Sequence, residues 1–215
     1  MGDSEDTQVT GESKTEKVKI GILSATSYLL PLASSIPPFW SGIMTMPFLL
    51  YLIGMTGNWQ IIAYPGDFFN LIAVFGSLLL IVYCVLYLWY KKRDAGLVTT
   101  GPYRLVRHPQ YFSVTIFTFI LTYQSVWILQ HTFGIGWLSA NQTILLWVGM
   151  LLAYIGIALV EERHLSIVFG PPWEKYRHQV GFLIPYVKFK SKVLEAIVCL
   201  VIPIIILYAA LFLFR

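Results

Sequence analysis

Long stretches without charge constrain this chain more than any other feature. Between Lys19 and Lys91 the one charged residue is Asp67, and residues 110–160 contain no Asp, Glu, Lys or Arg. A helix that crosses a bilayer needs about 20 predominantly apolar residues. The chain is 57% hydrophobic and 12% charged, whereas a soluble domain is about 45–50% apolar and about 25% charged. We therefore predict an all-α, polytopic membrane helix bundle.

The apolar stretches predict about five to six transmembrane helices. Four are expected at 68–90, 110–130, 142–160 and 193–214. Residues 18–36 and 41–58 are interpreted as two further spans joined by a tight Pro-Pro turn. One kinked span with a re-entrant piece is the alternative there, because four prolines interrupt the apolar run.

The chain divides into four regions. These are a disordered polar N-terminus at 1–17, N-terminal transmembrane helices at 18–90, a core of two loops that flank a transmembrane hairpin at 91–192, and a C-terminal transmembrane helix at 193–215. The expected disorder of the first region follows from its richness in Glu, Thr, Ser and Lys.

Positive charge gathers in two loops, 91–109 and 161–192. Two spans separate these loops, so they lie on the same side of the membrane, and their basic character predicts that this side is cytosolic. The loops hold 11 of the 15 Lys and Arg residues, namely Lys91, Lys92, Arg93, Arg104, Arg107, Arg163, Lys175, Arg177, Lys188, Lys190 and Lys192. Membrane topology thus explains the net charge of +4, and no nucleic-acid partner is expected.

The first loop ends in a segment that can attract an anion. Residues 96–112 read GLVTTGPYRLVRHPQYF. Pro109 suits the first turn of the following helix, and the free N–H groups of such a helix start attract groups such as a carboxylate. The alternative is a basic juxtamembrane anchor with an ordinary helix start.

The second loop opens with two carboxylates. Glu161 and Glu162 directly follow a long uncharged span, where a carboxylate is costly unless it is paired or used in function. An apolar stripe then leads to Gly170, a common helix stop, so we expect a helix that extends from the membrane to this glycine. The alternative is a charged flank that merely stops the span.

A second, interfacial helix is expected after Pro171. Trp173, Tyr176 and Val180 lie beyond it at positions i, i+3 and i+7, so they share one helical face. The alternative is an ordinary surface helix.

A metal site is not expected. Glu161 and His164 have the i, i+3 spacing of a di-iron carboxylate motif, but such a site needs a second copy and two further carboxylates. Cys84 and Cys199 both lie inside apolar stretches and supply neither a zinc quartet nor a disulfide framework.

Together the two loops resemble the isoprenylcysteine carboxyl methyltransferase family of integral membrane enzymes. The resemblance covers about 96–187. It rests on GPYRLVRHPQY at 101–111 and EERHLSIVFG at 161–170, followed by WEKY and VGFLIP. It implies a methyltransferase that binds S-adenosylmethionine at the cytosolic interface. The implied acceptor is lipophilic or prenylated, such as a prenylcysteine carboxylate, or is a thiol.

The resemblance also implies which residues bind the cofactor. From the first loop these are Tyr103, Arg107, His108, Pro109 and Tyr111, and from the second loop Glu161, Glu162, Tyr176 and Arg177. No catalytic general base is named, because a carboxylate or thiolate acceptor does not strictly require one.

One segment departs from the family pattern. Pro171, Pro172 and Trp173 replace a more acidic, tyrosine-containing stretch. A tryptophan at that spacing also occurs in the related membrane sterol reductases, which bind NADPH. An NADPH-dependent sterol-type reductase is therefore the alternative function, and a non-enzymatic membrane interaction protein is the second alternative.

Overall fold

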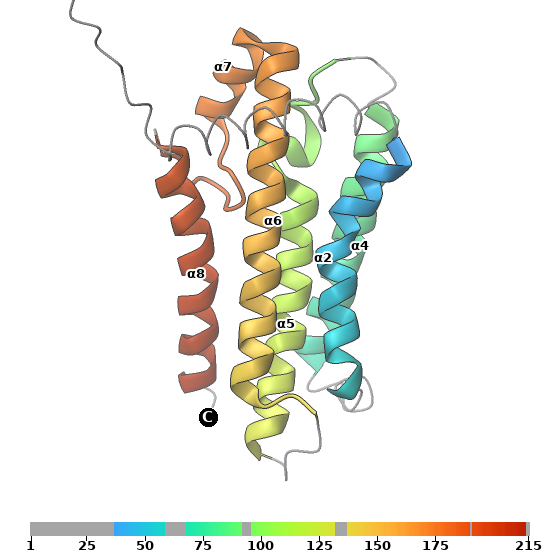
Figure 1. Ribbon diagram of the computed structural model, residues 1–215, viewed down its shortest axis with the longest axis vertical. Coiled ribbons are helices and arrows are strands. Elements are labelled where there is room, and N and C mark those ends of the chain that lie inside the picture. The colour runs from blue at the N-terminus through green and yellow to red at the C-terminus, as the bar shows by residue number, and fades with distance from the viewer. Residues whose placement is uncertain (1–36, 59–67, 92–95, 132–136, 190, 214–215) are drawn as a thin grey trace, which may run out of the picture. The chain divides into compact units, whose positions relative to one another are not determined.

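The structure is a computed structural model that describes residues 37–58, 68–91, 96–131, 137–189 and 191–213. Its described helices are α2 (Pro37–Met55), α4 (Phe68–Lys91), α5 (Pro109–His131), α6 (Ala140–Phe169), α7 (Pro171–Gln179) and α8 (Lys192–Leu213), with 3-10 turns η1 (Thr56–Asn58) and η3 (Gly101–Arg104) (Figure 1). The β-type pairing found within these ranges is an isolated bridge between Val106 and Gly181. The predicted all-α class is confirmed.

Four of the described helices are long and apolar enough to cross a membrane. They span Asn70–Lys91, Pro109–His131, Ala140–Phe169 and Lys192–Leu213, close to the four predicted ranges. This pattern indicates a multi-pass membrane protein. The span expected at 18–36 and the disordered tail expected at 1–17 lie outside the described residues, so the total of five to six spans stays a prediction.

The chain forms two compact units, Met1–Ile43 and Met44–Arg215. In the first unit the structure describes only the start of α2, from Pro37. The prolines at 37 and 38 therefore begin a helix, whereas the sequence predicted a turn that ends before residue 41. The physical reason is that a proline fits the first helical turn, where its missing N–H leaves no bond unmade.

In the second unit α5 and α6 form the interior. α5 contacts α4, α6 and α8, and α6 also contacts α7 and α8. About half of the apolar window of α5 (50%) and of α6 (44%) is buried, against 11% for α4 and for α8. The outer faces of α4 and α8 therefore remain apolar and exposed, as expected for helices that face lipid.

Two local signals set the ends of α6. The side chains and backbones of Ser139 and Gln142 form a reciprocal capping box at its start. At its end Gly170 adopts a positive φ of 56°, which glycine tolerates best. The helix therefore continues past the predicted span of 142–160 and carries Glu161 and Glu162 on helical backbone, as the expected extension to Gly170 requires.

Helix α7 packs as its sequence pattern predicts. Trp173, Tyr176 and Val180 are all buried and form one apolar cluster, against which Leu97, Leu165 and Phe169 pack. The shared face predicted from the sequence is confirmed.

Candidate functional site

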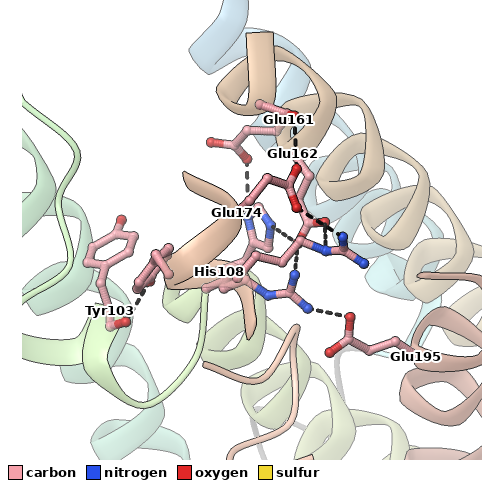
Figure 2. Close-up of polar contacts among 10 residues, drawn as sticks. Tyr103, His108, Glu161, Glu162, Glu174 and Glu195 are labelled. Atoms are coloured by element: carbon pink, nitrogen blue, oxygen red, sulfur yellow. Dashed lines mark hydrogen bonds and ion pairs between the residues drawn. The ribbon is translucent and has the colours of Figure 1, made fainter. Parts of the chain in front are cut away.

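The two polar segments of the sequence meet in space. Arg107 Nη1 lies 2.8 Å from Glu162 Oε1, and His108 Nδ1 lies 3.3 Å from Glu161 Oε2. His108 Nε2 is also 3.7 Å from Glu162 Oε1 (Figure 2). The end of the first loop and the C-terminal part of α6 therefore form one charged cluster.

Backbone contacts hold the first of these segments in place. The N–H of Arg107 donates to the carbonyl of Gly181 at 2.9 Å, and the Tyr176 hydroxyl donates to the carbonyl of Tyr103 at 2.6 Å. Gly181 fits closely, because a Cβ built there would lie 2.8 Å from the carbonyl oxygen of Val187. Helix α7 and the segment after it thus fix the backbone that carries Arg107 and His108.

Arg107 is the buried centre of the cluster. Its side chain has 0% exposure, and it pairs with Glu162 of α6 and with Glu195 of α8. The Glu162 contact is an ion pair without hydrogen-bond geometry, whereas Arg107 Nη2 donates a hydrogen bond to Glu195. Glu195 was not among the site residues predicted from the sequence. The available signal was that Glu195 is the one charged residue in 193–214.

His108 is buried and contacts aromatic rings and carboxylates. Its ring stacks on Tyr111 (centroids 5.5 Å apart, 16° between planes) and meets Phe182 edge-on. Burial alone would lower the pKa of His108, but the nearby Glu161 and Glu162 carboxylates outweigh burial and raise it to about 9. The imidazole is therefore protonated at neutral pH.

A hydrogen bond and a second arginine complete the cluster. The Tyr111 hydroxyl donates to Glu161 Oε2 at 3.2 Å, the same oxygen that faces His108. Arg177 Nε lies 3.9 Å from Glu162 Oε2, and its Nη1 donates to Glu174 at 3.4 Å. Glu174 is a further residue that the sequence did not single out.

A cavity of about 400 Å³ lies beside this cluster, within the range of small-molecule sites. Its lining combines charged groups with apolar and aromatic side chains: Leu88, Gly96, Leu97, Val98, Tyr103, Arg107, His108, Glu161, Leu165, Val168, Phe169, Trp173 and Tyr176.

The predicted cofactor residues divide into two groups. Tyr103, Arg107, His108, Glu161 and Tyr176 line the cavity. The others, Pro109, Tyr111, Glu162 and Arg177, are not among its lining residues. Glu162, Tyr111 and Arg177 contact lining residues or each other and thereby support them, and Pro109 begins α5 as predicted.

The chemistry of the lining favours an organic ligand with both charged and apolar parts. Burial raises the pKa of Tyr103 and of Tyr176, so both phenols stay neutral. Among the described residues no group of three His, Cys, Asp or Glu side chains is arranged to hold a metal ion.

Comparison of the chain with family models, with curated proteins and with solved structures finds no match. The resemblance to the isoprenylcysteine carboxyl methyltransferases therefore rests on the motifs at 101–111 and 161–185 alone.

Proposed function

We propose that the protein is an integral membrane methyltransferase that uses S-adenosylmethionine and acts on a lipophilic acceptor. The observation that carries the proposal is the meeting of Arg107 and His108 with Glu161 and Glu162 beside one cavity. These residues belong to the two motifs of the family resemblance, which lie about 50 residues apart in the chain. The proposal places this site on the cytosolic side of the membrane, as the charge of the loops predicts.

The charges of the cavity suit a zwitterionic methyl donor. Glu161 is the lining carboxylate, and its side chain is 19% exposed, so it is the group to pair with the donor's ammonium. The protonated His108 and the start of α5 attract the donor's carboxylate. Glu162 is already paired with Arg107, so its role is to hold Arg107 and His108 in position.

The aromatic lining suits the sulfonium of the donor. Tyr103 and Tyr176 both line the cavity, and an aromatic face attracts a nearby cation by about 0.5–2 kcal/mol. Methyl transfer cancels the sulfonium charge, so a site that excludes water favours the transition state. The protein then has to hold the acceptor atom, the methyl group and the sulfur in line.

The acceptor is expected to be a prenylcysteine-type carboxylate or a thiol. Either supplies its own electron pair when it is ionised, so the reaction needs no general base from the protein. Incubation of membranes that contain the protein with labelled S-adenosylmethionine, and then identification of the labelled product, distinguishes the two acceptors.

The cavity is less suited to NADPH, the cofactor of the alternative reductase. NADPH carries several phosphate charges, and phosphate sites normally offer free Arg or Lys groups. The described lining offers two cationic residues, Arg107 and His108, and Arg107 already pairs with two carboxylates, so too few cations remain for several phosphate charges.

Isothermal titration of the detergent-purified protein tests the proposal. We expect wild-type protein to bind S-adenosylmethionine and not NADPH, and we expect Glu162→Gln and His108→Ala to abolish this binding with expression intact. His131→Ala is the matched control, because His131 lies at the far end of α5. Binding of NADPH alone would favour the reductase, and binding of neither compound would favour a non-enzymatic membrane protein.

A further inference from the structure

One side chain of the cavity wall has a buried polar atom without a partner. Trp173 is 1% exposed, and its indole Nε1 makes no hydrogen bond to any described residue. A buried N–H left unpaired costs about 1–3 kcal/mol, and a buried tryptophan usually finds an acceptor for this group. Trp173 also lines the cavity, so a ligand in the cavity contacts the side chain that carries this donor.

The hydroxyl groups of the two tyrosines in the lining already donate hydrogen bonds. The Tyr176 hydroxyl donates to the carbonyl of Tyr103, and the Tyr103 hydroxyl donates to Gln110 Oε1 at 3.0 Å. Glu161 Oε2 accepts from Tyr111 and faces His108. Among the tyrosine and tryptophan side chains of the described lining, Trp173 is therefore the one whose donor makes no hydrogen bond.

The surroundings of Trp173 favour a flat, weakly polar ring. Its ring lies 5.6 Å from that of Tyr176, and Leu97, Leu165 and Phe169 pack on the same cluster. All five of these residues also line the cavity. Because each of the five is uncharged, this wall offers no ion-pair partner to an ammonium or a carboxylate.

We propose that the wall formed by Leu97, Phe169, Trp173 and Tyr176 is the nucleobase pocket of the site and that Trp173 Nε1–H donates to a ring nitrogen of a purine. This inference rests on the proposed function, because it assigns the adenine of S-adenosylmethionine to this wall. The indole N–H is a donor only, so it requires an acceptor such as a purine ring nitrogen. It does not by itself distinguish adenine from guanine, since N7 is an acceptor in both.

The test is titration calorimetry with S-adenosylhomocysteine and its 1-deaza, 3-deaza and 7-deaza analogues. We expect Trp173→Phe to weaken binding of S-adenosylhomocysteine about tenfold, which corresponds to about 1.4 kcal/mol. One of the three analogues should bind the wild type about tenfold more weakly, and for that analogue the Trp173→Phe penalty should largely disappear. Trp137→Phe is the matched control, because Trp137 is 71% exposed and is not among the cavity-lining residues.

A second variant separates hydrogen bonding from packing. β-(3-Benzothienyl)alanine at position 173 keeps the bicyclic shape but lacks the N–H, so it should reproduce the penalty even if Trp173→Phe does not fold. Equal binding to the wild type and to this variant would overturn the inference and leave the proposed function intact. An equal penalty with all three analogues would also overturn it, because Trp173 would then act by packing. If the wild type binds neither S-adenosylmethionine nor S-adenosylhomocysteine, the proposed function itself fails, and this inference fails with it.

Discussion

Glu195→Gln removes one of the two carboxylates that compensate Arg107, and we expect it to lower the free energy of unfolding by about 1.5–3 kcal/mol. The Arg107 side chain is fully buried, with Glu162 2.8 Å away and Glu195 as its second partner. At an effective dielectric constant of about 20, unit charges at such a distance attract by about 6 kcal/mol. Glu162 therefore still neutralises the guanidinium, and the variant exchanges a hydrogen bond between two charged groups for a weaker one to a neutral amide oxygen.

The double variant Glu162→Gln, Glu195→Gln should be disproportionately unstable. It leaves Arg107 without either carboxylate. A buried charge with no charged partner destabilises the fold more than the loss of one of two charged partners does. We expect the double variant to lose about 1–3 kcal/mol more than the sum of the two single variants, as residues in one network commonly do.

The assay is equilibrium unfolding in mixed detergent and dodecyl sulfate micelles, monitored by circular dichroism. Glu174→Gln is the control, because its side chain is 42% exposed and exposed ion pairs contribute about 1 kcal/mol or less. The assignment of Arg107 as a shared partner of both carboxylates would be refuted if Glu195→Gln were as stable as the wild type. It would also be refuted if the losses of the two single variants simply added up to the loss of the double variant.

The same cluster also predicts a pH dependence and a steric effect. The raised pKa of His108, about 9 against about 6.5 unfolded, stabilises the fold by an amount fully present below pH 6.5 and lost as pH rises through 9. The melting temperature of the wild type should fall between these two pH values, and that of His108→Gln should fall less. Parallel plots of melting temperature against pH for the two proteins would contradict this. Gly181→Ala should lower the melting temperature, because its Cβ would meet the carbonyl oxygens of Ile184 and Val187 and displace the bond to Arg107. Gly149→Ala, where a Cβ meets no atom within 4 Å, should not lower it; equal effects of the two glycine variants would count against the steric cause.

Much of the fold could be predicted because its signals are local. The absence of charge locates the four long helices, and Pro109 and Gly170 mark helix ends by their backbone properties alone. The start of α2 could not be predicted, because Pro37 is compatible both with a turn and with the first turn of a helix. The choice between them depends on the tertiary surroundings of the prolines, which residue spacing does not reveal.

The sequence singled out most residues of the charged cluster, but it did not predict which of them line the cavity. The family resemblance implied that His108 and Glu162 lie near the same ligand, and the structure places His108 Nε2 3.7 Å from Glu162 Oε1. That they share a ligand stays a prediction. It could not be predicted that Glu161 lines the cavity while Glu162 lies behind it. Adjacent residues point about 100° apart on a helix, so the rotation of α6 against its neighbours decides which carboxylate reaches the cavity.

The contribution of α8 lies furthest from what sequence patterns reveal. A lone carboxylate in an apolar span needs a partner, and Lys188 and Lys192, the nearest described lysines in the chain, offer local ones. In the structure Glu195 instead pairs with Arg107, 88 residues away. A guanidinium has several donors in a fixed fork, so Arg107 can serve Glu162 and Glu195 together, which a lysine does less well. A helix outside the range of the family resemblance thus completes the charge balance of the site, and the stability of α8 and the position of Arg107 depend on each other.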